Sequence, residues 1–170
     1  MAEVFENEGN ITSAESMFER ALKKYKYSKK VWSAYQLFQL RQNKVEVAKQ
    51  LLSRSLQSLS KHKHVEVTTR FACAEYDFGS VDRGRVLFEE LLSLYPKRFD
   101  LWNVYVDKEI KAGCYVHARA LFERMTSSKL SMKNMKSVFK KFLSFEVQHG
   151  SVAEQNAVKS RAREYAASLM

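Results

Sequence analysis

Turn-forming residues recur along this chain at a nearly constant spacing. Four of the five glycines, together with one asparagine, are separated by 34, 36, 34 and 37 residues: Gly9, Asn43, Gly79, Gly113 and Gly150. Glycine and asparagine both tolerate the left-handed backbone that often ends an α-helix. A repeat of about 34 residues is typical of stacked helix pairs. The spacing therefore predicts an all-α chain in which a helix ends at each of these positions.

A second pattern lies between these turns. Residues 31–35 read Val-Trp-Ser-Ala-Tyr, and two repeats later residues 101–105 read Leu-Trp-Asn-Val-Tyr. The second helix of each pair begins with a small residue, followed four positions later by a large apolar one: Ala14 with Phe18, Ala48 with Leu52, Gly84 with Phe88, and Ala118 with Phe122. Residues four apart share one helix face, and a small side chain lets two helices cross closely. We expect this face to be buried.

Capping signals agree with this division. Thr12 with Glu15 and Ser151 with Glu154 have the spacing of capping boxes, and Pro96 follows an expected helix end. We predict helices near 12–25, 29–42, 45–59, 65–78, 81–95, 100–112, 116–127, 132–149 and 152–168. They form a single domain, 1–170, made of a partial repeat 1–27 and repeats 28–61, 62–97, 98–130 and 131–170. Because only a few residues precede Gly9, the chain is expected to be part of a larger protein.

Composition excludes several kinds of site. The sequence has one proline and two cysteines, and no phosphate-binding loop, nucleophile motif or zinc motif. No apolar run approaches the roughly 20 residues of a membrane span, so no membrane partner is expected. We predict a chain that is not an enzyme and that needs no cofactor and no metal.

Acids on aromatic helix faces are the one feature that could suggest catalysis. An aromatic pair and an acid or amide recur at i, i+3 and i+7 on the first helix of a pair. A buried carboxylate needs a cationic partner, and a base follows the small residue of the second helix. We therefore favour structural ion pairs, Glu109 with Arg119 and Glu75 with Arg85, over acid–base chemistry. The structural repeat positions are Trp32, Tyr35, Glu75, Trp102, Tyr105, Glu109, Arg119 and Glu146.

Basic residues are concentrated toward both ends of a chain whose formal net charge is +10. Two groups stand out, one at a helix end and its connector, the other on a single helix: Lys23, Lys24, Lys26, Lys29 and Lys30, and Lys133, Lys136, Lys140 and Lys141. Such groups can be a solvated helix face, or they can contact nucleic-acid phosphates or an acidic protein. Both readings stay open at this point.

The motifs resemble a known repeat family. Trp102-x-x-Tyr105-x-x-x-Glu109 and the run from Ala118 to Arg124 are similar to the two helices of the HAT ("half a TPR") repeat. The resemblance covers nearly the whole chain and implies an α-solenoid (superhelix) of HAT/TPR-like antiparallel helix pairs. Two positions depart from the pattern, because Thr68 stands where tryptophan is expected and Gln39 where glutamate is expected.

A closer similarity extends over residues 63–125 and 139–150, which resemble the C-terminal HAT-repeat region of the ribosomal RNA processing protein five (programmed cell death protein eleven) family. This resemblance implies a protein-interaction scaffold in precursor ribosomal RNA processing, in the nucleus and nucleolus. The implied partners are other ribosome-biogenesis proteins of the small-subunit processome. Direct, largely sequence-independent binding of precursor ribosomal RNA or small nucleolar RNA is the alternative. Self-association is a further expectation, since it occurs among HAT proteins.

Overall fold

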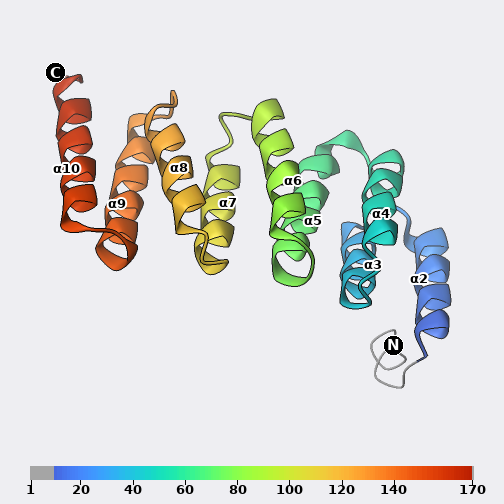
Figure 1. Cartoon of the computed structure of the whole chain (residues 1–170). Helices are drawn as coiled ribbons and strands as arrows, with labels where there is room; N and C mark the ends of the chain where they lie inside the picture. The colour runs from blue at the N-terminus through green and yellow to red at the C-terminus, as the bar shows by residue number, and fades with distance from the viewer. Residues whose placement is uncertain (1–9, 170) are drawn as a thin grey trace. The chain divides into compact units, whose positions relative to one another are not determined.

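The structure is a computed structural model that describes residues 10–169. All regular structure in that range is helical (Figure 1). In chain order and with the labels of the figure, the helices are α2 (Ile11–Tyr25), α3 (Lys29–Arg41), α4 (Val45–Ser58), α5 (His64–Phe78), α6 (Val81–Leu94), α7 (Phe99–Lys111), α8 (Tyr115–Thr126), α9 (Met132–His149) and α10 (Val152–Ala167). A short 3-10 turn, η1 (Lys61–Lys63), precedes α5.

The helices group into two compact units, and the chain divides between them after Leu94. In the first unit, α3 packs with α4 and α5 with α6, while α2 and α5 also pack on α3. In the second unit, α7 packs with α8, α9 with α10, and α8 with α9. The fold class is therefore all-α, an α-solenoid of helix pairs, as the sequence predicts. The single domain over 1–170, with its repeat boundaries, stays a prediction.

Each predicted helix boundary lies within one residue of the observed one. At the start of α10 the predicted capping box is present: Ser151 N donates to Glu154 Oε2 at 2.6 Å, and Glu154 N donates to Ser151 Oγ at 3.3 Å. The box predicted at Thr12 is wrong. Helix α2 begins one residue earlier, and Asn10 caps it by accepting a hydrogen bond from Ser13 N at 3.2 Å.

The turns between paired helices are of two kinds. Asn43 and Gly113 have φ of 56° and 73°, the left-handed backbone that the spacing predicts. The amide that follows each of them donates to a carbonyl five residues back, at 2.9 Å in both turns. This is the six-to-one hydrogen bond of a Schellman motif. Gly79 and Gly150 have φ of −123° and −111° instead, so the left-handed backbone does not extend to them.

At Gly79 and Gly150 the absence of a side chain leaves room for a neighbouring carboxylate. A buried glutamate, Glu75 or Glu146, lies four residues earlier and folds its carboxylate against the glycine. A Cβ added at either glycine would stand far inside van der Waals contact with that glutamate's Oε2. The regularly spaced turn residues therefore have two roles. Asn43 and Gly113 adopt the left-handed backbone, whereas Gly79 and Gly150 leave room for a glutamate side chain.

Aromatic stacking repeats across the helix junctions. Phe18 of α2 stacks on Tyr35 of α3, with ring centroids 4.8 Å apart and planes 8° from parallel. Phe122 of α8 stacks on Phe142 of α9 at the same distance and the same angle. The small residues four positions earlier, Ala14 and Ala118, are both fully buried. The second helix of one pair thus packs on the first helix of the next in a reproducible geometry.

The two tryptophans occupy equivalent environments. Trp32 Nε1 donates to the Lys26 carbonyl at 2.8 Å, and Trp102 Nε1 donates to the Pro96 carbonyl at 3.0 Å. In both repeats an arginine from the paired helix lies over the indole ring: Arg54 at 5.6 Å and Arg124 at 5.1 Å from the ring centroid. Each tryptophan therefore links the first helix of its pair to the preceding connector and to the second helix of the pair.

Candidate interaction surfaces

The acids and aromatic residues at the structural repeat positions are part of the core. Trp32, Tyr35, Trp102 and Tyr105 are buried, and so are the acids Glu75, Glu109 and Glu146. Arg119 Nε donates to Glu146 Oε1 at 2.6 Å and Arg119 Nη2 to Oε2 at 2.9 Å, while Nη2 also lies 3.1 Å from Glu154 Oε1. These groups form helix-to-helix contacts inside the unit.

The two ion pairs predicted from the sequence are wrong in their partners. Arg119 pairs with Glu146, the acid of the following repeat, and not with Glu109, because α8 packs on α9. Glu75 pairs with Arg83, whose Nη2 lies 2.8 Å from its Oε2, and Ser80 N donates to the same oxygen at 3.2 Å. Arg83 stands closer than Arg85 to the turn after Glu75, and Arg85 pairs with Asp82 at 2.9 Å.

The junction between α2 and α3 has a similar polar contact, but its acid lies on the other helix. Glu15, the residue after Ala14 in α2, accepts from Gln39 Nε2 at 2.9 Å and from Lys44 Nζ at 2.6 Å. The hydrogen bond from Lys44 is the main reason why the pKa of Glu15 lies below its ordinary value, with Gln39 adding to it and burial opposing it. Gln39 can therefore replace the expected glutamate because the carboxylate has moved to the neighbouring helix.

This lowered pKa predicts a pH dependence for the first unit. A carboxyl group whose pKa falls on folding adds stability above its unfolded pKa, about 4.5, and that stability is lost as the pH drops through the folded value. We expect Glu15→Gln to flatten the pH dependence of the urea midpoint below pH 4.5. Glu46→Gln, in an exposed pair with Lys49, is the matched control. An unchanged profile in Glu15→Gln would contradict the assignment.

The first group of lysines lies at the end of α2 and in its connector to α3. Lys23, Lys24, Lys26 and Lys30 are exposed, whereas Lys29 forms an ion pair with Glu66 of α5. The amino groups of Lys24 and Lys26 lie over the neighbouring Tyr25 and Tyr27 rings, 5.3 and 4.9 Å from the centroids. The two tyrosines are 51% and 60% exposed. The sequence prediction missed these two rings.

The connector between α4 and α5 lies beside this first group of lysines. Lys63 of η1 donates to the Tyr27 carbonyl at 3.1 Å, although 36 residues separate them. This contact places the connector before α5 beside the first connector. We call the combined surface the connector edge: Lys24, Tyr25, Lys26, Tyr27, Lys30 and Lys63.

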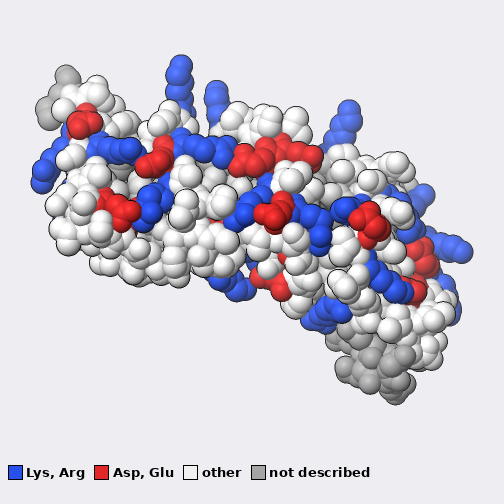
Figure 2. Space-filling model, viewed as in Figure 1, with Lys and Arg blue, Asp and Glu red and all other residues white. Residues whose placement is uncertain are grey.

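The second group of lysines is divided by the structure. Lys133, Lys136 and Lys140 are exposed on α9. Lys141 lies instead against α7, where its Nζ is 2.7 Å from Asp107 Oδ1 and donates to Asn103 Oδ1 at 3.3 Å. On the face seen in Figure 2, acidic and basic side chains are mixed. Only the first three lysines therefore form a stripe that a partner could contact.

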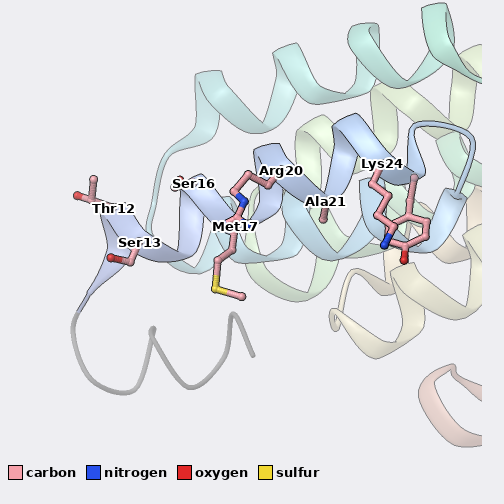
Figure 3. A pocket seen from close by; sticks show the side chains of 8 residues that line it. Thr12, Ser13, Ser16, Met17, Arg20, Ala21 and Lys24 are labelled. Carbon is pink, nitrogen blue, oxygen red and sulfur yellow. The ribbon is translucent and has the colours of Figure 1, made fainter.

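The outward side of α2 presents a third surface. A pocket there is lined by small hydroxyl and alanine side chains together with Met17 and Tyr25, and Arg20 and Lys24 are its cations. Figure 3 shows that the side chains drawn around this pocket all project from α2. Lys24 therefore borders both this pocket and the connector edge.

Exposed apolar side chains lie near two turns of the second unit. Val116 follows the turn before α8, while Val147 and Val152 flank the turn between α9 and α10, with exposed fractions of 75%, 61% and 71%. Within residues 10–169, no group of three or more His, Cys, Asp or Glu side chains is placed to hold a metal ion. None of the helices described is long and apolar enough to cross a membrane.

Comparison with known proteins gives similar sequences along nearly the whole chain. "Protein RRP5 homolog" of Mus musculus is 37% identical over 165 residues, which is 97% of this chain. "rRNA biogenesis protein rrp5" of Schizosaccharomyces pombe is 43% identical over 157 residues, 92% of the chain. "rRNA biogenesis protein RRP5" of Arabidopsis thaliana is 41% identical over 167 residues, 98% of the chain.

In each of these three relatives the matched segment is a small part, and the chain spans 9% of their length. No protein-family model matches the chain. The similarity therefore applies to one helical segment of much longer proteins.

Proposed function

The chain belongs, along nearly its own whole length, to the RRP5 family of rRNA biogenesis proteins, and on this premise we propose that it is a protein-interaction scaffold in precursor ribosomal RNA processing. Its partners are other ribosome-biogenesis proteins, those of the small-subunit processome, and its place of action is the nucleolus. The similarity to relatives named for rRNA biogenesis is the observation that carries this proposal.

The structural roles of the buried carboxylates support a scaffold function. The carboxylates that could have suggested acid–base chemistry are engaged in packing, as Glu146 is with Arg119 and Glu75 is with Arg83. Helix pairs of this kind build extended surfaces from which a partner can be contacted over many residues. The exposed valines at the turns of the second unit are side chains that such a partner could cover.

An affinity experiment tests the scaffold. The tagged chain is incubated with nucleolar extract treated with ribonuclease, and bound proteins are identified by mass spectrometry. We expect small-subunit processome proteins to be retained, because a protein scaffold does not depend on RNA. Recovery of none of them, by a chain shown to be folded by circular dichroism, would count decisively against the proposal.

Direct RNA binding is a second function, and the connector edge favours it. Exposed aromatic rings beside lysines are the combination by which proteins stack single-stranded bases and neutralise phosphates without reading sequence. The edge combines Tyr25 and Tyr27 with the exposed Lys24, Lys26 and Lys30. The stripe on α9 has lysines without exposed aromatic residues between them, and is the weaker candidate of the two.

Substitutions distinguish RNA binding at the connector edge from RNA binding at the lysine stripe on α9. We expect Tyr27→Ala to weaken binding of a single-stranded oligonucleotide roughly tenfold, since one base–ring stack is worth about 1–3 kcal/mol. Lys24→Glu with Lys26→Glu should reduce the dependence of affinity on salt, measured by titration at several ionic strengths. The matched control is Lys133→Glu with Lys136→Glu and Lys140→Glu on α9. A larger loss in the control than at the connector edge would contradict this placement.

A further inference from the structure

A cavity lies inside the first unit where one repeat lacks an aromatic ring. In the junctions described above, the residue four after the small one is Phe18 or Phe122, and it stacks on the aromatic residue of the next helix. In α4 the same position is Leu52, and the residue it should cover is Phe71. Both line a cavity of about 230 Å³ between α3, α4, α5 and α6.

The cavity has the size and the lining for an aromatic ring. Its volume exceeds the roughly 150 Å³ of an apolar cavity that takes up benzene. Most of its wall is apolar, and Val86, 57% exposed, stands at its edge. A ring in this place would lie against Phe71 as Phe18 lies against Tyr35.

Gln36, a residue of the wall, has one buried polar atom without a hydrogen-bond partner in the part of the chain that the structure describes. Gln36 is 1% exposed, and its Nε2 donates to the Phe71 carbonyl at 3.1 Å. Its Oε1 is buried and meets no donor among the described residues. A buried acceptor without a donor costs free energy, so a ligand that brings an N–H or O–H group gains from pairing with it.

Charged residues at the mouth of the cavity indicate which kind of residue would flank the partner's ring. Lys49 and Arg83 line the cavity with Glu75 as the one acid, and Glu75 is already paired with Arg83. The side chain of Lys49 is 51% exposed and forms an ion pair with Glu46 at 2.8 Å, an exposed pair of little strength that a partner's carboxylate can replace. The chain as a whole has a formal net charge of +10. Acidic residues beside the ring would therefore be attracted to this mouth.

We propose that this cavity binds a tyrosine or tryptophan side chain, flanked by acidic residues, of a protein partner. The inference rests on the proposed scaffold function and names the chemistry of one contact within it. A nucleobase fits the wall less well, because it has several polar groups to satisfy and Gln36 is the one uncommitted polar group that we find in the lining. The partner's hydroxyl or indole N–H donates to Gln36 Oε1 while its ring lies on Phe71.

Small probes test the cavity with the full 170-residue chain. Methyl NMR titrations with p-cresol and toluene follow the signals of Leu52, Val86 and Leu87. We expect saturable shifts at these methyl groups, with toluene bound several times more weakly because it cannot donate to Gln36. Leu52→Phe should reduce p-cresol affinity at least tenfold by filling the cavity. It should also fold, since phenylalanine holds this position in other repeats.

Leu94→Phe is the matched control, since Leu94 is 72% exposed at the end of α6, outside the cavity lining, and this variant should bind p-cresol like the unmodified chain. Two blocked tripeptides then test the flanks: a tyrosine between two glutamates should bind more tightly than one between two lysines. Absence of saturable binding, or equal binding to Leu52→Phe, overturns the proposal. Tighter binding of adenosine or uridine than of p-cresol overturns it in favour of a nucleobase. These outcomes are independent of the extract experiment, so either proposal can fail alone.

Discussion

Replacing Phe122 by alanine is expected to lower the free energy of unfolding of the second unit by about 3–5 kcal/mol. Phe122 is fully buried and contacts two rings of α9, stacking on Phe142 and lying 5.4 Å from the Phe145 ring centroid. Alanine would remove both contacts and leave a cavity that the surrounding helices can fill only in part. Urea denaturation followed by circular dichroism measures the loss.

Two comparisons make this prediction specific. Phe122→Leu should cost less than Phe122→Ala, because leucine keeps part of the buried apolar volume. Helices of a repeat protein depend mainly on their neighbours, so hydrogen exchange at the Trp32 indole should not change in Phe122→Ala. A loss below about 1 kcal/mol, the average for any substitution, would mean that Phe122 does not connect α8 to α9.

Replacing Arg119 by methionine is expected to cost about 3 kcal/mol, the lower end of the range for breaking a buried ion pair. Its partner Glu146 is 1% exposed in its side chain and would be left as an uncompensated buried carboxylate. The arginine side chain is 25% exposed, so water can reach the vacated position and moderate the effect.

A double-mutant cycle isolates this pair. Arg119→Met combined with Glu146→Met should recover much of the stability lost in Arg119→Met, because two methionines leave no buried charge. Urea midpoints of the four chains give the coupling free energy. If the double variant is as unstable as the sum of the single ones, the pair is uncoupled and the assignment is wrong.

The sequence predicts the helices because their signals are local. Turn residues, caps and the small-to-large spacing lie within one helix or at its end, so α9 begins at Met132 and ends at His149 as expected. The ion pairs were wrong in their partners because they depend on which helices pack together. Periodicity places Arg119 on a buried face, but only the packing of α8 on α9 shows that this face meets Glu146.

The candidate surfaces were harder to predict for the same reason. Lys141 follows Lys140 in sequence, yet it is turned toward Asp107 of α7 while its neighbour stays exposed. The connector edge depends on the contact of Lys63 with Tyr27, which no local pattern reveals. The cavity at Leu52 had a visible signal, a leucine where other repeats have phenylalanine, but its size depends on how far the surrounding helices close around it.

Hydrogen exchange at the two tryptophan indoles tests the repeat most directly. The chain has two tryptophans, so both side-chain N–H signals can be followed in one NMR spectrum. Each indole donates to a backbone carbonyl six residues earlier, Trp32 to Lys26 and Trp102 to Pro96. Paired helices in equivalent repeats predict that both N–H groups are strongly protected from exchange. An indole that exchanges as fast as free tryptophan, in a chain that is folded, would contradict the equivalence on which the scaffold is built.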